Sequence, residues 1–475
     1  MTKTVASLGL YFLNIVILLV EIFFLVANWN MVPAYPLIWT NICFPFTIVS
    51  IIFNLLYIWI KRIKIYDLRI VMILLMYIFM YGRIWLIQLG MQDLLTWSLH
   101  KLIPLESLFN TSLFVICCNQ LLFLGLFFGK EIGIKQSIPE TTSPYILNAI
   151  EKTGIVLLVI AIPCRLITDI SLYFTTNVTG SYLNYQNATG LFDDFAFLLV
   201  PGLICVCESH KRQRFIFLAT AFTYFIVVMA LTGDRRYYAA SILALSMYFV
   251  FSLLRKEYRK RHFISIAIMI ILGLVFLNFL AVVQKMRVNG LVSLSEFISI
   301  YSGDIFALDD VFFDVLSEFG ISFFSLASVI EHVPNYLNYQ CGSTIIKAIP
   351  SVLPFGFFNS ILGVVSPSDY INNYTGLPVG GTLYGDLYAN FGFFSFPFVF
   401  LTGFVIKILG SRLNPHKSTI NVVFYFTISF VLVNLVRCTI FEIIRPIVWC
   451  TLIPYFIFRL FYRGTVLDGR AAIRG

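Results

Sequence analysis

Long apolar runs follow one another along almost the whole chain, and this pattern constrains the fold more than any single motif does. A helix needs roughly 20 apolar residues to cross a bilayer, and its backbone groups must be satisfied internally because the hydrocarbon holds no water. Hydrophobic residues make up 59% of the chain and charged residues only 12%, a balance that a soluble domain could not adopt without exposing apolar surface. The sequence therefore predicts an all-α protein, a polytopic bundle of transmembrane helices, and excludes a soluble enzyme with one membrane anchor.

About twelve such runs can be separated by their polar punctuation. We expect membrane helices near residues 6–27, 37–60, 68–90, 105–128, 153–176, 190–207, 215–232, 237–254, 263–285, 387–410, 419–436 and 446–462. The first run is too long for a signal-peptide core and lacks a small-residue cleavage pattern, so we expect it to stay as the first helix.

Clusters of basic residues lie between alternate pairs of these runs. Examples are Lys61 to Lys64, Lys211 to Arg214, and Arg412 with Lys417. With twelve helices all such clusters fall on one side, which the positive-inside rule makes cytoplasmic, together with both termini. The protein is thus expected in the inner membrane. The clusters also account for the formal net charge of +9, so nucleic acid is not expected as a partner.

One segment is far too long for a simple connection. Residues 286–386 separate the ninth and tenth expected helices and should form a large external loop, since loops of this length carry function or their own structure. This divides the chain into residues 1–285 with nine helices, the loop, and residues 387–475 with three helices and a cytoplasmic tail. Residues 294–332 show helical periodicity, and residues 345–365 are apolar but broken by prolines, which predicts short amphipathic or re-entrant helices; a two-span hairpin is the alternative.

Several arginines contradict the positive-inside pattern because they fall on the outer side. They are Arg235, Arg236, Arg287, Arg437 and Arg445. Guanidinium groups offer planar, bidentate donors to phosphate, and charges near a bilayer are usually paired or functional. As a group these arginines predict a pyrophosphate clamp. The alternative is a set of structural locks, in which Asp234 pairs with Arg235 or Arg236 and Glu442 pairs with Arg445.

Two charged residues within the membrane have a simpler explanation. Arg165 and Asp169 are four residues apart, so they share one helix face and can neutralise each other. We expect this pair to be structural and place it outside the site.

Three short stretches, taken with the helix count and the late external loop, resemble the Wzy-type O-antigen and capsule polymerases. They are "TGDRRYYA" at residues 232–239, an Arg-x-x-Gly element at residues 287–290, and "GGTLYGDLYANFGFFSFPFVFLTG" at residues 380–403, of which residues 380–392 match best. The resemblance implies a GT-C-like bacterial glycosyltransferase that transfers a glycan chain from undecaprenyl pyrophosphate onto a lipid-linked repeat unit at the outer face of the inner membrane. It also implies no metal or cofactor, and a chain-length regulator as a further partner beside the lipid-linked oligosaccharide and membrane lipid.

Roles for individual residues follow from this chemistry. Growing negative charge on the leaving pyrophosphate would be stabilised by the arginines, with Arg287 in the catalytic centre and Arg235, Arg236, Arg437 and Arg445 as pyrophosphate ligands. A base for the acceptor hydroxyl could come from Glu318, His332 or Asp386. Asp386 lies at the start of a membrane helix, where a plain capping role would also explain it. Tyr384 and Tyr388 are expected to contact sugar, and no residue is assigned to a metal.

Three rival functions remain open from the sequence. An O-antigen ligase shares the many-helix, large-loop design and characteristically uses a loop histidine, a role that His332 could fill. A flippase for lipid-linked oligosaccharides has a similar helix count but is expected to show two related halves instead of a long external loop. A non-enzymatic assembly partner would tolerate replacement of the outer arginines.

Overall fold

The chain forms an all-α structure, and ten of the helices described here are long and apolar enough to cross a membrane. The computed structural model describes residues 2–31, 38–91, 103–129, 143–179, 191–232, 236–254, 319–353 and 380–474, together with Phe313, Leu316 and Ser317. The helices are α1 (Thr2–Asn28), α2 (Ile38–Lys61), α3 (Leu68–Gln88), α4 (Leu105–Phe127), α5 (Pro144–Thr179), α6 (Leu191–Ala196), α7 (Leu199–Ser209), α8 (Arg214–Thr232), α9 (Arg236–Leu254), α13 (Ser322–His332), α14 (Ser343–Ser351), α17 (Leu383–Phe391), α18 (Ser395–Arg412), α19 (Thr419–Val433), α20 (Ile440–Ile447) and α21 (Ile453–Arg474). The described residues contain no strand, and the predicted polytopic helical architecture is confirmed.

The ten candidate spans correspond to ten of the twelve predicted helices. The predicted helix at 263–285 lies outside the described residues. The predicted helix at 190–207 is instead divided into α6 and α7. Pro201 explains the division, because it has no N–H to donate to the carbonyl of Phe197 four residues earlier. That carbonyl accepts a hydrogen bond from Cys450 Sγ at 3.5 Å instead.

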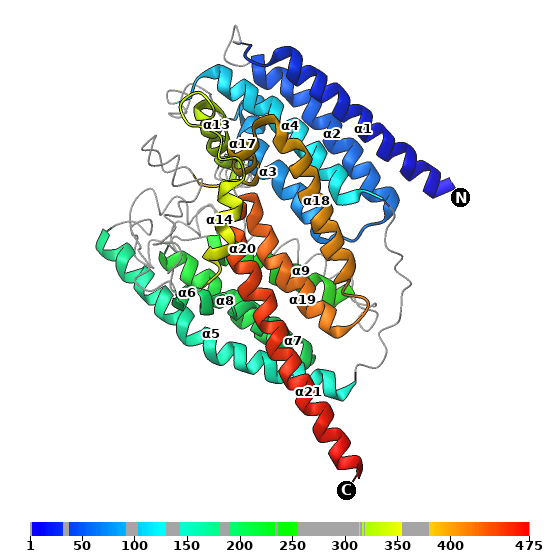
Figure 1. Ribbon diagram of the computed structural model, residues 1–475, viewed down its shortest axis with the longest axis vertical. Helices are drawn as coiled ribbons and strands as arrows, with labels where there is room; N and C mark the ends of the chain where they lie inside the picture. Colours follow the sequence, from blue (N-terminus) through cyan, green and yellow to red (C-terminus); the bar gives the residue numbers. More distant parts are fainter. Residues whose placement is uncertain are drawn as a thin grey trace.

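The helices form two groups that lie side by side (Figure 1). In the first group α1, α2, α3 and α18 pack around α4, with α13 and α17 at one end. In the second group α5 packs against α6, α7, α8 and α21, while α19 packs against α7 and α9. Tyr425 on α19 joins the groups by accepting a hydrogen bond from the backbone N–H of Leu68 on α3 at 2.8 Å. The junction between the two groups is where the candidate site lies.

One end of the molecule gathers the basic connections. Tyr66, after α2, hydrogen-bonds His416, between α18 and α19, at 2.8 Å. Phe251, near the end of α9, packs its ring against His416 with centroids 5.4 Å apart. We call this end, formed by residues 61–66, 251–254 and 412–418, the basic end. The α9 helix ends at the basic end and α19 begins there. The start of α9 and the break between α19 and α20 therefore lie at the opposite end of the molecule.

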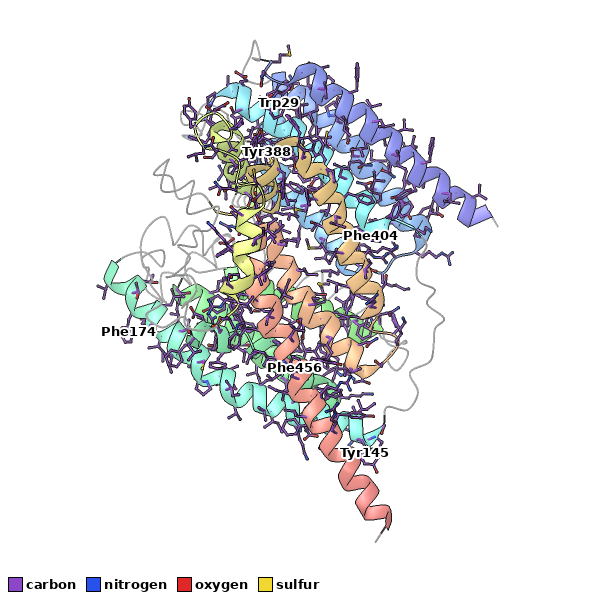
Figure 2. All side chains as sticks on the ribbon, in the orientation of Figure 1. Trp29, Tyr145, Phe174, Tyr388, Phe404 and Phe456 are labelled. Carbon is purple, nitrogen blue, oxygen red and sulfur yellow. The ribbon has the colours of Figure 1, made fainter. Side chains whose placement is uncertain are left out.

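Large apolar side chains cover the outside of the bundle, as expected for a surface that faces lipid. Phe174 on α5 is 60% exposed and Phe456 on α21 is 63% exposed; Phe174 lies at the edge of the molecule in Figure 2. In contrast, α4 is the most enclosed of the spans and forms the centre of the first group.

The crossing of α4 and α18 depends on two glycines. A Cβ atom at Gly403 would lie 2.5 Å from the carbonyl oxygen of Leu122, and one at Gly125 would overlap the carbonyl oxygen of Phe400. Both obstacles are backbone atoms, so the helices can approach this closely only without side chains at these positions.

Replacing Gly403 with alanine should therefore push α18 away from α4 and lower the free energy of unfolding by roughly 1–3 kcal/mol. Thermal unfolding of the detergent-solubilised protein would measure this loss. The matched control is Gly410→Ala on the same helix, where a Cβ would lie at an ordinary 3.8 Å from Tyr425. If Gly403→Ala melted at the same temperature as Gly410→Ala, the tight crossing would not be needed for stability.

Candidate functional site

The α17 helix begins four residues before the predicted helix at 387–410, and its first turn places Asp386. Thr382 caps the helix by accepting a hydrogen bond from Gly385 N at 3.0 Å. A Cβ at Gly385 would lie only 2.8 Å from the Thr382 hydroxyl oxygen, so glycine is needed beside the cap. Asp386 therefore does not cap its own helix.

The Asp386 carboxylate instead caps α20. Its Oδ2 accepts a hydrogen bond from the backbone N–H of Ile440, the first residue of α20, at 2.8 Å. Its Oδ1 accepts from Asn390 Nδ2 at 3.0 Å and from the Thr344 hydroxyl at 3.3 Å. Asp386 is 1% exposed. It thus ties the starts of α14 and α20 to α17, and helix N-termini are the ends that favour a negative group.

Asn390 extends this network to the turn before α14. Its side-chain amide donates to Thr344 Oγ1 at 2.7 Å, and its Oδ1 accepts from the N–H of Gly342 at 2.9 Å. Gly342 has φ of 80°, a conformation that favours glycine. From this turn α14 runs alongside α20, and Trp449 Nε1 donates to the Val352 carbonyl at 3.3 Å.

The break between α19 and α20 carries Arg437, whose side chain has no partner among the described residues. Thr439 and Glu442 form a capping box, with Thr439 N donating to Glu442 Oε2 at 2.8 Å and Glu442 N donating to Thr439 Oγ1 at 3.2 Å. Arg437, two residues before Thr439, is half-buried, and its guanidinium makes no hydrogen bond or ion pair with any residue that the structure describes. Both nearby acids, Asp386 and Glu442, are already used by backbone donors.

Arg445 has a partner in the structure, but it is not Glu442, the partner in the alternative interpretation of the sequence. Glu442 is held in the capping box, and Arg445 Nη2 instead donates to the buried Asp194 on α6. The Glu442–Arg445 pairing that this alternative offered is therefore not formed, because the capping box turns the glutamate back toward the helix start. Arg445 Nε is buried and has no hydrogen-bond partner among the described residues.

The short helix α6 contacts three other helices, α20, α5 and α9. Asp194 binds Arg445 of α20, and Asp193 Oδ1 accepts from Thr168 of α5 at 3.0 Å. Tyr237, the second residue of α9, donates from its hydroxyl to the Ala196 carbonyl at 3.1 Å. The start of α9, which carries Arg236, is thereby held against the helix that binds Arg445.

The predicted pairing of Arg165 with Asp169 is confirmed. Arg165 Nη2 lies 2.5 Å from Asp169 Oδ1, and both side chains are buried. The tyrosines of the "GDRRYY" stretch complete the pair: Arg165 lies over the Tyr237 ring at 4.1 Å and the Tyr238 ring at 4.7 Å, and Tyr238 donates to Asp169 Oδ1 at 2.6 Å. Tyr224 donates to the other carboxylate oxygen. This part of the motif is structural and positions the start of α9.

Removal of one partner of this pair should be costly. Asp169→Ala would leave a buried guanidinium uncompensated and is expected to lower the free energy of unfolding by roughly 3–5 kcal/mol. The double variant Arg165→Met, Asp169→Leu carries no buried charge and should be clearly more stable than the single variant. Detergent melting curves of both proteins test this, and equal stability of the two would contradict the buried-pair argument.

The structure describes some of the other predicted site residues and not others. Arg235, Arg287 and Glu318 lie outside the described residues, and of Arg236 the backbone alone is described. His332 ends α13 and directs Nδ1 to the Ser328 carbonyl at 2.7 Å. Tyr384 is fully buried and donates to Asn119 Oδ1 at 2.8 Å. Tyr388 is 3% exposed and lies among α13, α17 and α4 in Figure 2. Sugar binding by these two tyrosines stays a prediction.

Two tyrosines of the stretch "NYLNYQ" are exposed in the structure. Tyr336 and Tyr339 follow α13 and are 61% and 38% exposed. The Tyr339 hydroxyl oxygen approaches Gly392, where a Cβ would lie 2.8 Å away. Gly392 adopts φ of 55° and interrupts the predicted helix with a 3-10 turn, Gly392–Phe394. Exposed aromatic residues of this kind are more often part of a membrane-interface belt than a sugar-binding surface.

Comparison with known proteins supplies one match. The chain matches the protein family described as O-antigen polysaccharide polymerase Wzy over residues 11–467, nearly its full length. No curated protein matches the chain, and no solved structure matches it. Among the described residues no group of three or more His, Cys, Asp or Glu could hold a metal ion.

Proposed function

The chain belongs to the O-antigen polysaccharide polymerase Wzy family, and from this premise we propose that it joins undecaprenyl-pyrophosphate-linked repeat units into O-antigen or capsular polysaccharide. The reaction would take place at the outer face of the bacterial inner membrane, with the basic end and both termini toward the cytoplasm. The family supports a polymerase role in O-antigen synthesis; the substrate, the residues and their roles below are our proposal.

The proposed reaction is a glycosyl transfer that needs stabilisation of a leaving group. The acceptor hydroxyl oxygen bonds to the anomeric carbon of the donor sugar, while the bond from that carbon to the pyrophosphate oxygen breaks. The hydroxyl proton passes to a base, and the pyrophosphate leaves with the bonding electron pair. Donors fixed where this charge develops lower the barrier most effectively in a site that excludes water.

The observation that carries the proposal is the guanidinium of Arg437, for which the described part of the chain supplies no partner. It lies at the break before α20, at the end of the bundle opposite the basic end, and the acids beside it are bound by backbone N–H groups. A buried or half-buried cation without a counter-ion favours a mobile anion. We assign Arg437 to the pyrophosphate, together with Arg235, Arg236 and Arg287. Arg445 would join them by turning its Nη2 from Asp194 to a phosphate oxygen, which would also bring its Nε, now without a partner among the described residues, toward the anion.

Asp386 acts in this proposal as a positioning residue. Its three accepted hydrogen bonds and its burial hold the start of α20, and therefore the Arg437 turn, against α14 and α17. The base for the acceptor hydroxyl would then be His332 or Glu318. The open rings of Tyr336 and Tyr339, which are close in sequence to His332, provide a surface on which sugar rings could stack.

A reconstituted polymerisation assay tests this function. Purified protein in nanodiscs would receive its authentic lipid-linked repeat unit in the presence of EDTA, beside an Arg287→Ala variant. A product ladder from the wild type alone is expected. If the wild type gave no ladder but, in sealed proteoliposomes, moved the repeat unit across the bilayer, the protein would be a flippase.

The ligase alternative is separated by changing the acceptor in the same assay. A ligase would transfer one completed glycan to lipid A core and would give no ladder. Transfer of this kind that is abolished by His332→Ala would replace the polymerase proposal. A ladder that survives His332→Ala would instead leave Glu318 as the candidate base.

A further inference from the structure

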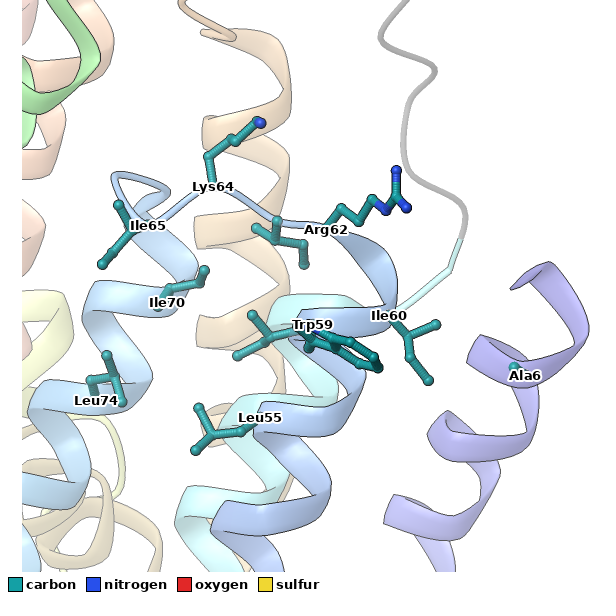
Figure 3. A pocket seen from close by; sticks show the side chains of 11 residues that line it. Ala6, Leu55, Trp59, Ile60, Arg62, Lys64, Ile65, Ile70 and Leu74 are labelled. Carbon is teal, nitrogen blue, oxygen red and sulfur yellow. The ribbon is translucent and has the colours of Figure 1, made fainter. Parts of the chain in front are cut away.

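A groove with an apolar wall and a cationic rim opens at the basic end, on the outside of the first helix group. It has a volume of about 930 Å³ and lies between α1, α2 and α3. Leu55 and Trp59 of α2 and Leu74 of α3 form much of its wall, while Arg62 and Lys64 extend from the turn after α2 (Figure 3). The volume is within the range of sites that hold small organic molecules, about 300–1,000 Å³.

The two rim cations are not neutralised by any residue that the structure describes. Arg62 and Lys64 are exposed, and neither forms a hydrogen bond or ion pair with a side chain in the described part of the chain. Asp67, the nearest acid in sequence, is occupied by Arg69, whose Nε and Nη2 donate to its two oxygens at 3.0 and 2.8 Å. No carboxylate is among the residues that line the groove. The rim therefore presents two positive charges above an apolar wall.

The backbone at Arg62 gives a second reason to attach function to its side chain. Arg62 has φ of 53°, and its N–H donates to the Trp59 carbonyl at 3.0 Å while Ile63 N donates to the Ile58 carbonyl at 3.3 Å. These two bonds form the Schellman ending of a helix, in which this position is usually glycine because a Cβ is disfavoured there. Arginine occupies a position where glycine would be more stable, and the guanidinium is what glycine lacks.

We propose that this groove is a binding site for an anionic phospholipid of the surrounding membrane. The phosphate of the headgroup would be bound by Arg62 and Lys64, and an acyl chain would lie along Leu55, Trp59 and Leu74. Charge and shape match this ligand: basic pockets between membrane helices bind anionic headgroups, and the residues that line the groove besides the two cations are all apolar. This site is remote from Arg437 and Asp386 and does not depend on the proposed polymerase activity.

Trp59 provides the measurement, because it lines the groove and is 75% exposed. Phosphatidylglycerol with brominated acyl chains quenches tryptophan fluorescence on contact. The chain has six tryptophans, and subtracting the quenching of a Trp59→Phe variant, which keeps the other five, leaves the quenching of Trp59. Competition with brominated phosphatidylcholine gives the relative affinity for the anionic lipid. We expect phosphatidylglycerol to bind the wild type more tightly, with a loss of roughly fivefold for each cation removed.

Arg62→Gly and Lys64→Gln are the test variants, and Arg412→Ala is the control with the same change in charge outside the groove. Glycine suits the backbone at position 62, so Arg62→Gly should fold at least as well as the wild type while losing lipid preference. A wild-type preference near one, or a preference that Arg62→Gly and Lys64→Gln leave unchanged, would overturn the proposal. Displacement of phosphatidylglycerol by undecaprenyl pyrophosphate at equal concentration would also overturn it and assign the groove to the substrate lipid.

Discussion

Replacing Arg437 with alanine is expected to reduce the rate of polymerisation by about 10²–10³-fold, the loss typical of removing one donor that stabilises a developing oxyanion. The fold should persist, because the Arg437 side chain has no hydrogen-bond or ion-pair partner among the described residues. Single-turnover assays on the lipid-linked repeat unit measure the rate, and thermal unfolding measures the fold.

Two further variants separate the guanidinium from its charge. Arg437→Lys keeps the cation but loses planar, bidentate donation, so we expect an intermediate rate. Arg412→Ala removes a cation at the basic end and should leave the rate unchanged. An Arg437→Ala protein that is folded and polymerises at the wild-type rate would exclude this residue from pyrophosphate binding and weaken the clamp as a whole.

The helical membrane fold could be predicted from the sequence because its cause is local. Each span has to satisfy its own backbone in lipid, so apolar length alone indicates a helix. Starts and breaks were harder to predict. Pro201 divides a predicted span, and the carbonyl that it leaves free accepts from Cys450, a residue far along the chain. Gly392 interrupts another span at a positive φ, where Tyr339 from outside the helix approaches closely. The early start of α20 had a local signal, the Thr439-x-x-Glu442 capping box, that the apolar pattern alone did not show.

The pairing of charges depended on tertiary structure to a greater degree. Arg165 and Asp169 could be paired from sequence because four residues of helix bring them together. The partner of Arg445 could not be predicted in this way, because Asp194 lies 251 residues earlier in the chain, on the short helix α6. In the "GDRRYY" stretch the residue pattern predicted a role for the two arginines, whereas the contacts that the structure describes are made by Tyr237 and Tyr238.

Asp386 shows how one residue type is consistent with two roles until its partners are known. A carboxylate at the outer start of a membrane helix predicts either a base or a cap. The structure describes a cap across the chain, for α20 instead of α17, and places the carboxylate in the junction of the two helix groups. This geometry predicts that substitution of Asp386 lowers the stability of the fold.

Asp386→Ala is expected to lower the free energy of unfolding by roughly 2–6 kcal/mol, since it leaves the buried donors of Ile440 and Thr344 unpaired at about 1–3 kcal/mol each. Asp386→Asn should cost less, but its amide would still face one of these donors. Detergent melting curves provide the measurement, and Thr402→Val on the exposed face of α18 is the neutral control.

A second substitution can identify the cap itself. Proline at position 440 removes the N–H that Asp386 binds and suits the first position of a helix, and Thr439 already has the extended backbone that precedes proline. Ile440→Pro should therefore restore part of the stability lost by Asp386→Ala, and the double-mutant cycle gives the coupling between the two residues. An Asp386→Asn protein that melts like the wild type but forms no ladder would show the opposite, that the carboxylate takes part in the chemistry and that its contacts with α14 and α20 are secondary.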